Sequence, residues 1–495
     1  METIVSIRPF LAILISLLAV PLIILSGKKP NLRESWTFIA AILKFLLVLS
    51  LLPIILQGIS IEYTIAQVLP DVGIKLRVDT MGMIFALVSS FLWIVTSAYS
   101  IGYMRKLKEH SQTRFFCFFA ISLSATIGVA FSANLLTMYL FYEMLSFATY
   151  PLVTHHQDKE AKKSGRKYLL YIVGSSIGLV LPAMLVIYQL TGTLEFSRQG
   201  VFSGAESAVL IGVLMVMMLF GFAKAGIMPF HSWLPAAMVA PTPVSALLHA
   251  VAVVKVGVFC ILRVTTGTFG TDLLNAHGYG PIMATIAAVT IITASVIALS
   301  QDSLKGRLAF STVSQLSYIV LGAALLTPLG LMGGMMHIAM HAFGKITLFF
   351  CAGAIFVSTG AKQISQMAGI GKQMPLTMSA FFIGALSVIG LPPGGGFLSK
   401  WYLILGTLEA DQMIMLFVLL ISSILNAAYF MPVVYKAFFC TPEDSQFQER
   451  IKEAPLWCLI PLLITAVCSI LLLFYPQPFF TLAEMSVEGI FLNSK

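Results

Sequence analysis

The sequence predicts an all-α polytopic membrane protein with about 14 transmembrane helices. Of its 495 residues, 58% are hydrophobic and only 10% are charged, and the mean hydropathy is +0.93. A soluble protein carries roughly 25% charged residues, so this chain could not cover its surface in water. A spanning helix uses about 20 apolar residues, and the apolar total matches about fourteen such helices. These values exclude a soluble enzyme, a disordered chain and a nucleic-acid-binding protein, although the formal net charge is +9.

An outer-membrane β-barrel is excluded as well, because its alternating strands need far less continuous hydrophobicity. Apolar runs between clusters of charged or turn residues give the expected spans in order. They lie at 7–26, 36–56, 80–103, 114–131, 134–154, 168–190, 207–228, 243–266, 280–300, 308–327, 330–358, 377–407, 412–438 and 455–475. We expect the first run to be a retained span and not a cleaved signal peptide, since no small-residue cleavage site follows it.

The distribution of lysine and arginine predicts the orientation of the chain. These residues are concentrated in alternate connections, such as 28–33, 105–114 and 159–167. Loops on the cytoplasmic side of a membrane are enriched in Lys and Arg. We therefore expect a multi-pass protein of the inner (plasma) membrane with both termini on the outer side. The basic excess then faces the lipid headgroups and not a nucleic acid.

Ionisable residues inside the spans mark the candidate site, because each costs about 2.5–3.5 kcal/mol at the middle of a membrane. The set that we expect to carry ions consists of Glu143, Lys224, Lys255, Lys345, Lys400, His249, His337 and His341. A static buried ion pair between Glu143 and Lys224 is the alternative to a transport role for those two. Lys44 is left out of the site, since a lysine near a helix end can extend its amine to the interface.

Three of these residues recur at a helical spacing. His337, His341 and Lys345 stand at i, i+4 and i+8, so they share one helix face and extend along about 12 Å of its axis. Stacked titratable groups of this kind indicate a pathway for protons or a lining for hydrated ions. His249 and Lys255 are six residues apart and do not share a face, but both could point into one lumen.

Two spans are interrupted next to a lysine. Lys224 precedes Ala-Gly-Ile-Met-Pro229, and Lys400 follows Pro392-Pro393-Gly-Gly-Gly396. A break inside a bilayer is tolerated only where protein or water satisfies the backbone, and transporters place such breaks near the midplane. The breaks fall in spans seven and twelve, and this odd offset predicts two inverted five-helix repeats. The expected division is 1–112, a first repeat 113–266, a second repeat 267–438, and a polar loop with the last span in 439–495.

Four motifs carry a resemblance to a known family. They are KAGIMPFHSWLPAAMVAPTPVSALLHAVAVVK from Lys224 to Lys255, STVSQLSY from Ser311, HAFGK from His341 and GLPPGGGFLSK from Gly390. With them the chain resembles the antiporter-like, proton-translocating subunits of respiratory complex I, of Mrp-type multisubunit cation/proton antiporters and of membrane-bound hydrogenases. The residues around Pro241 and Pro392 are most similar to those of the Mrp D-type subunit. The resemblance covers roughly residues 75–438.

The resemblance implies fourteen core helices, an inverted five-helix repeat and a polar axis along the membrane midplane. It implies that Glu143 pairs with Lys224 and that Lys255 is the central relay, with His249 nearby. His337, His341 and Lys345 would form the connecting row, and Lys400 the end of the outward half-channel, where some members of the family have glutamate. Because few residues follow the last predicted span at 455–475, we expect no long lateral helix of the kind that the largest complex I homologue has.

The expected function is therefore proton or cation/proton translocation within a multisubunit complex. The partners would be other membrane subunits, the lipid bilayer, and protons or Na⁺, with no nucleic acid. We expect no cofactor, no metal ligands and no catalytic residues on this chain. Two alternatives remain: the ion-pumping subunit of an NADH:quinone oxidoreductase or hydrogenase, and a stand-alone secondary solute transporter. The six cysteines lack C-x-x-C spacing and are interpreted as small buried hydrophobes.

Overall fold

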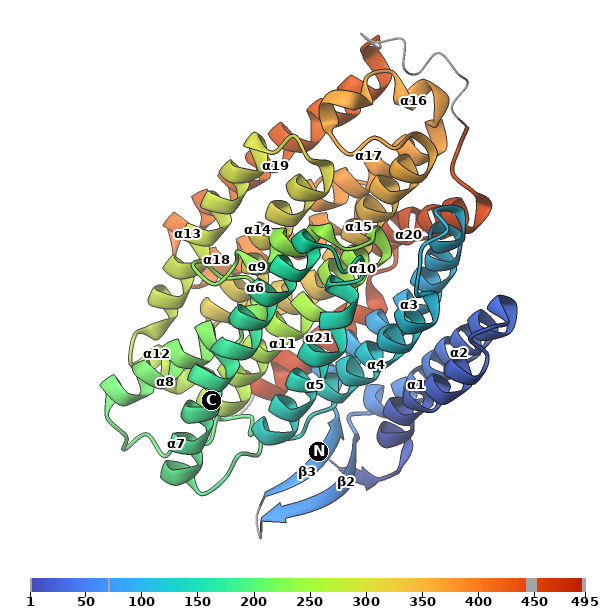
Figure 1. The fold of residues 1–495 in the computed structure, drawn as a ribbon. Coiled ribbons are helices and arrows are strands. Elements are labelled where there is room, and N and C mark those ends of the chain that lie inside the picture. The colour runs from blue at the N-terminus through green and yellow to red at the C-terminus, as the bar shows by residue number, and fades with distance from the viewer. Residues whose placement is uncertain (1, 70–71, 442–451, 492–495) are drawn as a thin grey trace.

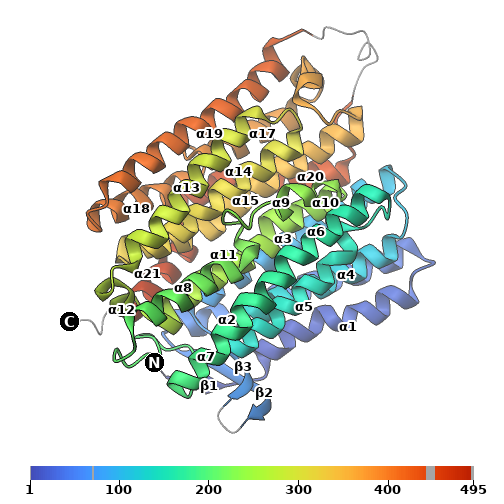
Figure 2. The same cartoon turned by 60° about the vertical axis from the view of Figure 1, so that its left-hand side comes forward.

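A computed structural model describes residues 2–69, 72–441 and 452–491, apart from the side chains of Leu69, Leu248 and His249. The helices run in a common direction and form one bundle, with a small sheet at one end (Figures 1 and 2). The α-helices in the bundle are α1 Arg8–Leu25, α2 Pro30–Leu56, α3 Thr80–Lys106, α4 Gln112–Ala130, α5 Leu135–Val153, α6 Lys159–Ser175, α7 Leu181–Thr191, α8 Ala208–Gly221, α11 Val253–Val264, α13 Tyr279–Ser300, α14 Leu304–Ala324, α15 Pro328–Thr359, α17 Pro375–Ile389, α18 Gly396–Glu409, α19 Met413–Phe439 and α20 Leu456–Phe474.

Within the described residues, nine helices are long and apolar enough to cross a membrane, and α8 and α17 are shorter apolar helices. Most of the predicted spans coincide with these elements to within a few residues, but the helix of the sixth span begins at Lys159 and not at residue 168. Large apolar side chains are exposed on the outer faces of the bundle, for example Leu18, Leu43, Val289, Ile424 and Val467. Because exposed apolar surface of this extent is stable in lipid and not in water, the predicted polytopic helical membrane architecture is confirmed.

Shorter helices connect these elements. They are α9 Trp233–Ala236, α10 Thr242–Ala246, α12 Thr271–Ala276 and α16 Ile370–Gln373, while α21 Gln477–Phe491 follows α20. Helix α15 lies at the centre of the bundle, and most of its residues are buried against α14, α17, α18 and α20. Since α15 carries His337, His341 and Lys345, the predicted row lies in the core of the fold.

A three-stranded sheet that the sequence analysis did not predict closes one end of the bundle. Strands β1 Thr3–Val5, β2 Ser60–Leu69 and β3 Val72–Val78 lie in the order β1–β2–β3, with β1 parallel to β2 and β2 antiparallel to β3. We call this the sheet end of the bundle. We call the opposite end, which carries the Lys- and Arg-rich connections, the basic end. Both β1 and α21 lie at the sheet end, where their residues line a common cavity.

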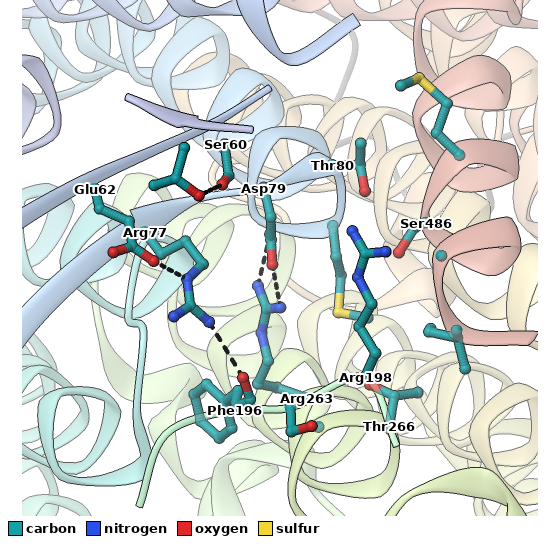
Figure 3. A pocket seen from close by; sticks show the side chains of 17 residues that line it. Ser60, Glu62, Arg77, Asp79, Thr80, Phe196, Arg198, Arg263, Thr266 and Ser486 are labelled. Atoms are coloured by element: carbon teal, nitrogen blue, oxygen red, sulfur yellow. Dashed lines mark hydrogen bonds and ion pairs between the residues drawn. The ribbon is translucent and has the colours of Figure 1, made fainter. Parts of the chain in front are cut away.

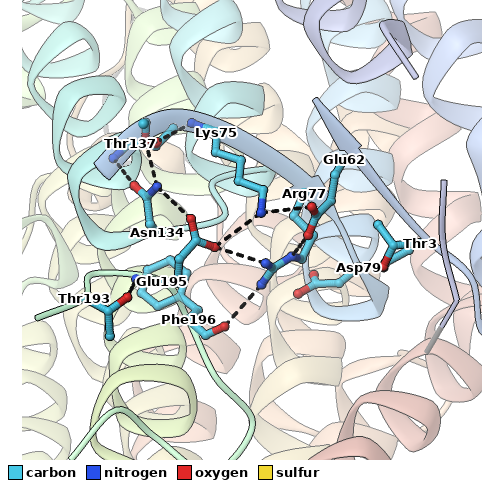
Figure 4. A network of polar contacts seen from close by, with 12 residues as sticks. Thr3, Glu62, Lys75, Arg77, Asp79, Asn134, Thr137, Thr193, Glu195 and Phe196 are labelled. Carbon is cyan, nitrogen blue, oxygen red and sulfur yellow. Dashed lines mark hydrogen bonds and ion pairs between the residues drawn. The ribbon is translucent and has the colours of Figure 1, made fainter. Parts of the chain in front are cut away.

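A polar network fastens the sheet to the helices (Figure 4). Arg77 of β3 contacts Glu62 of β2 at 2.5 Å and Glu195, in the connection after α7, at 3.0 Å. Lys75 contacts the Glu62 carboxylate at 2.9 Å, and the amide of Asn134 donates to Glu195 at 3.3 Å. Burial alone would raise the pKa of Glu62, but hydrogen bonds from Lys75 and Arg77 outweigh it and lower the pKa from its ordinary value.

The two interrupted spans are broken where the sequence predicted. Helix α8 ends at Gly221 and is followed by a 3₁₀ turn at Ala223–Ala225, while α17 ends at Ile389 and α18 begins at Gly396. Protein groups satisfy the backbone at both breaks. The indole of Trp233 donates to the Ala223 carbonyl at 3.0 Å, and Gly396 N–H donates to the Ser387 hydroxyl at 3.2 Å. This is the condition under which a helix can be interrupted inside a bilayer.

Candidate functional site

The predicted lysines and histidines are buried inside the bundle and do not face lipid. Buried side chains from the predicted set are those of Lys224, Lys255, His337, His341, Lys345 and Lys400, of which Lys400, at 5%, is the most exposed. Glu143 is partly buried. The side chain of His249 lies outside the described residues, so its expected place near Lys255 remains a prediction.

Lys255 and His341 form the centre of the site. The Nζ atom of Lys255, on α11, lies 2.7 Å from Nδ1 of His341, on α15. One helical turn away, the ring of His337 stacks on that of His341, with centroids 5.6 Å apart. The spacing of the two histidines on α15 therefore brings both rings into one line that begins at Lys255.

The line continues from α15 to the second helix break. Nδ1 of His337 lies 2.8 Å from the hydroxyl of Ser399, the residue before Lys400. The ring of Tyr318, on α14, stacks on His337 with centroids 5.6 Å apart, and its centre lies 4.7 Å from the Lys400 amine. Lys400 donates to the carbonyl of Ile389 at 2.8 Å. Since Ile389 ends α17, the cation stands at the negative end of a half-helix.

Lys345 lies on the same helix as His337 and His341, but its side chain contacts a different set of residues. Its amine donates to the Ser311 hydroxyl at 2.6 Å, and the hydroxyl oxygen of Tyr429 lies 2.8 Å from the same oxygen. Tyr429 donates to the side-chain carbonyl of Asn426. Lys345 therefore connects α15 to α14 and α19, and does not lie between His337 and Lys400.

Lys224 sits in the first helix break, against α5. Its amine donates to the Tyr142 carbonyl and to the Ser146 hydroxyl, each at 2.6 Å, and lies 3.2 Å from the centre of the Tyr142 ring. A direct ion pair between Glu143 and Lys224, which the resemblance implied, is absent from the described part of the chain. The reason is helical geometry. Tyr142 and Ser146 share the α5 face that meets Lys224, and Glu143 is rotated about 100° from Tyr142.

Glu143 lies towards the lateral surface of the bundle. The side chains of Leu140 and Phe147, three residues before it and four after it on the same helix face, are 41% and 59% exposed. Both carboxylate oxygens of Glu143 are nonetheless shielded from solvent and lack a hydrogen-bond partner among the described residues. Such a group needs a water, a proton or a neighbouring chain to complete its bonding.

Further buried polar atoms near the row also lack protein partners. In the part of the chain that the structure describes, they are Nε2 of His337, Nε2 of His341, both amide atoms of Gln315 and Nδ2 of Asn426. Buried polar groups are nearly always hydrogen-bonded, and where protein atoms do not serve, ordered water does. The arrangement therefore indicates a hydrated interior along α14, α15 and α19.

Two glycines, Gly257 and Gly390, allow neighbouring segments to pack closely around Lys224 and Lys400. A Cβ atom on Gly257 would lie 2.1 Å from the backbone nitrogen of Ala225, so α11 packs directly onto the break at Lys224. A Cβ atom on Gly390 would lie 2.4 Å from the side chain of Lys400, and Gly390 has a φ of +90°. Because glycine has no Cβ atom, the backbone at these two positions can pack directly against the Lys224 segment and the Lys400 side chain.

Lys44 does not behave as predicted. Its side chain is fully buried, and its amine donates to Ser16 at 2.6 Å and to the Leu123 carbonyl at 3.1 Å. The expectation that it extends to the interface is therefore wrong, because α1 and α4 supply hydrogen-bond acceptors close to it. It remains apart from the row around Lys255.

A cavity of about 430 Å³ opens at the sheet end (Figure 3). Arg263, at the end of α11, crosses it and contacts Asp79 through two bonds of 2.5 and 2.9 Å. Asp79 in turn caps α3, accepting from Gly82 N–H at 2.8 Å. This ion pair fixes the end of the helix that carries Lys255.

The polar partners of the charged residues were not predicted from the sequence. Tyr142, Ser146 and Tyr429 carry no charge and lie outside the motifs quoted above. Ser311, Tyr318 and Ser399 lie within motifs that the resemblance used, and those motifs were their only signal. Neutral serines and tyrosines are common in apolar helices, so only the fold shows which of them face a lysine.

Comparison with known proteins identifies relatives that match most of the chain. The chain is 32% identical over 438 residues to NADH-quinone oxidoreductase subunit N of Desulforudis audaxviator, covering 84% of this chain and 85% of that one. It is 30% identical over 512 residues to the A-type subunit of a Na⁺/H⁺ antiporter from Alkalihalophilus pseudofirmus, covering 96% of this chain. It spans only 62% of that relative's length.

Solved structures share the fold over nearly the whole chain. The Mrp complex from Dietzia sp. DQ12-45-1b matches with a TM-score of 0.88 at 21% identity, and the archaeal membrane-bound sulfane sulfur reductase with 0.88 at 23%. Each match covers 98% of both chains. Residues 132–426, more than half of the sequence, match the family described as NADH:quinone oxidoreductase/Mrp antiporter, TM. The chain belongs to this family of transmembrane subunits.

Proposed function

We propose that this chain is a proton or cation/proton translocating membrane subunit of a multisubunit complex. The residues that carry the protons in this proposal are Glu143, Lys224, His249, Lys255, His341, His337, Lys345 and Lys400. The observation that supports it most is the contact between Lys255 and His341, continued by His337, Ser399 and Lys400. Charged groups buried in this way are costly in a membrane, and a transport role accounts for that cost.

The contact geometry supports proton transfer between neighbouring groups. A protonated Lys255 can donate along its 2.7 Å contact to Nδ1 of a neutral His341, which leaves a neutral amine and an imidazolium. The imidazolium then releases a proton from Nε2, an atom with no partner among the described residues. Water next to that atom would carry the proton towards His337. Only N–H bonds and the O–H bonds of the water are made or broken.

At the other end of the row, Glu143 would control proton affinity at Lys224. The carboxylate lies within electrostatic range of that amine without contacting it. A change in the charge or position of Glu143 therefore changes how strongly Lys224 holds its proton. The helix break gives Lys224 room to respond, because α8 ends before it at Gly221.

Neighbouring subunits complete the proposal. Glu143 lies on a face of α5 whose adjacent side chains are exposed, and a carboxylate facing lipid would be strongly disfavoured. We infer that another membrane subunit covers this face. We also propose the orientation that the basic connections predict, with the sheet end outside and the basic end in the cytoplasm. The division into repeats 113–266 and 267–438 is part of the same proposal.

The narrower assignment is an Mrp-type Na⁺/H⁺ antiporter subunit of the D-like type. The motifs around Pro241 and Pro392 favour it, and the Mrp complex shares the fold. A specific observation favours the second candidate, an ion-pumping subunit of a redox-driven complex. The relative named subunit N of an NADH-quinone oxidoreductase is 32% identical and is covered over 85% of its length. The subunits that copurify with the chain distinguish the two.

The experiment uses the complete complex, purified with this chain and reconstituted into proteoliposomes. Lys224→Ala and Glu143→Ala are each compared with wild type for proton movement, measured with a pH-sensitive dye, and for subunit composition. We expect both variants to assemble and to lose translocation. Full transport by either variant would refute the assignment of these residues.

A further inference from the structure

A second cluster of titratable side chains lies at the basic end, away from the row around Lys255. Glu109 and His110 belong to the connection between α3 and α4, and His155 and His156 to the connection between α5 and α6. The ring centroids of His110 and His155 are 4.7 Å apart, and those of His155 and His156 are 5.6 Å apart. Residues of two separate connections thus meet in one place, which is why the sequence alone predicted no metal ligands.

The three imidazoles converge on one carboxylate oxygen of Glu109. Oε2 of Glu109 lies 3.9 Å from Nδ1 of His110, 3.8 Å from Nε2 of His155 and 3.8 Å from Nδ1 of His156. One ligand atom each from Glu109, His110 and His156 lie within 4.8 Å of one another. These separations are too long for hydrogen bonds. They are close to the spacing of about 3.4 Å between ligand atoms that surround a tetrahedral Zn²⁺ at about 2.1 Å.

His155 gives an independent indication of a ligand. Its side chain is fully buried, and neither ring nitrogen has a hydrogen-bond partner within the described ranges. A buried imidazole without hydrogen-bond partners is costly to fold, and a metal ion bound to a ring nitrogen is a partner that would satisfy it.

The backbone around the cluster is held in place. The side-chain amide of Gln112 donates to the carbonyls of Met104 and Glu109, at 3.2 and 3.1 Å. Arg114 donates to the carbonyl of His155 at 2.8 Å. Both connections are therefore fixed by side chains other than the proposed ligands, so the ligands meet without ordering a loop at binding.

The cluster is also accessible from the solution. The side chains of His110 and His156 are 51% and 35% exposed. Glu109 and His156 line a cavity of about 590 Å³, together with Asp158 and Glu160. A cation can therefore reach the ligand atoms without crossing the apolar interior, and the acidic groups beside the cluster favour its approach.

We propose that Glu109, His110, His155 and His156 bind one transition-metal ion of the Zn²⁺ class, which joins the α3–α4 connection to the α5–α6 connection. Three imidazoles and one carboxylate suit Zn²⁺, Co²⁺ or Ni²⁺ and disfavour Mg²⁺ and Ca²⁺, which prefer oxygen ligands. The site is separate from the translocating row, so it stands whether or not the proposed function is correct.

The test uses the full chain in detergent, purified without a polyhistidine tag and stripped with EDTA. Zn²⁺ is titrated by calorimetry, and Co²⁺ by its visible absorption, which is intense when four ligands surround it tetrahedrally. We expect one equivalent to bind with a Kd below about 1 μM, the absorption of tetrahedral Co²⁺, and no binding of Mg²⁺. Wild-type chain that takes up no stoichiometric Zn²⁺ would overturn the proposal.

Variants of the exposed ligands locate the site without disturbing the core. His110→Ala and His156→Ala should each weaken Zn²⁺ binding at least about tenfold, because each removes a direct ligand. His277→Ala, which removes a histidine at the other end of the bundle, serves as the matched control and should bind as wild type does. Unchanged Zn²⁺ affinity in the double variant His110→Ala/His156→Ala would contradict the proposal.

Discussion

The amine of Lys255 lies 2.7 Å from Nδ1 of His341, although the two residues are 86 positions apart in the sequence. Lys255 belongs to the first predicted repeat and His341 to the second. The contact therefore joins the two predicted repeats inside the buried core of the bundle. A proton that crosses from one half to the other would do so along this contact.

A substitution at Ser399 tests how the row continues from His337. Its hydroxyl lies 2.8 Å from Nδ1 of His337 and is the side-chain group that links this ring to α18. We expect Ser399→Ala to lower the translocation rate by about tenfold, which corresponds to a barrier about 1.4 kcal/mol higher. The measurement is dye-reported proton uptake by proteoliposomes that contain the complete complex.

Ser317→Ala is the matched control for that variant. Ser317 is buried as well, but its hydroxyl donates to the Val313 carbonyl within its own helix. Its replacement should leave transport near the wild-type rate. Equal effects of the two substitutions would mean that Ser399 has no special role.

A substitution at Gly257 tests whether the close packing of α11 against the first helix break is needed for stability and transport. A Cβ atom at this position would lie 2.1 Å from the nitrogen of Ala225 and 2.3 Å from the carbonyl carbon of Lys224, and backbone cannot move aside cheaply. We expect Gly257→Ala to destabilise the protein by about 1–3 kcal/mol and to reduce transport, because Lys224 is displaced. Thermal unfolding in detergent and the proteoliposome assay measure the two effects.

The control for Gly257 is a glycine with free space around it. Nothing lies within 4 Å of a Cβ atom on Gly178. Gly178→Ala should therefore preserve both stability and transport. If Gly257→Ala behaved in the same way, the close contact between α11 and the break would not matter for function.

The fold was predicted more completely from the sequence than the site was. Each span was visible because a helix must be apolar along about 20 residues to cross a bilayer, and both breaks carried proline and glycine. The sheet at the sheet end was missed because β2 and β3 lie in a connection between two predicted spans. Glu62, Lys75 and Arg77 were visible only as charges in a connection.

Within the site, the charged residues of the sequence correctly indicated which side chains are buried, but not which groups those side chains contact. Lys224, Lys255 and Lys400 are buried as expected. An ionisable side chain in an apolar span faces the interior of the bundle because its exposure to lipid is costly. Lys224 is hydrogen-bonded to Tyr142 and Ser146 and not directly to Glu143, because one residue of helical rotation separates Glu143 from the face of α5 that meets Lys224. Contacts of that kind depend on how α5 is turned, which the sequence pattern does not determine.

The network at the sheet end predicts a pH dependence of stability. Contacts with Lys75 and Arg77 lower the pKa of Glu62 below its ordinary value of 4.5. The folded state therefore holds the Glu62 proton less tightly than the unfolded state. The resulting stability is fully present above pH 4.5 and is lost as the pH falls through the lowered pKa.

Glu62→Gln should abolish that part of the acid sensitivity. We expect the variant to be about 1 kcal/mol less stable than wild type at neutral pH and to converge with it as the pH drops below 4.5. Thermal unfolding in detergent across this range measures the difference. A constant difference at every pH would show that Glu62 is not the group responsible.

The most direct test of translocation along the buried row compares two lysines that are equally buried. Lys255 contacts His341 in the row, whereas Lys44 is bonded to Ser16 and Leu123 apart from it. Proton transport is measured per assembled complex for Lys255→Met and Lys44→Met in proteoliposomes. We predict that Lys255→Met abolishes transport and that Lys44→Met retains it. Transport by Lys255→Met at the wild-type rate would contradict the account.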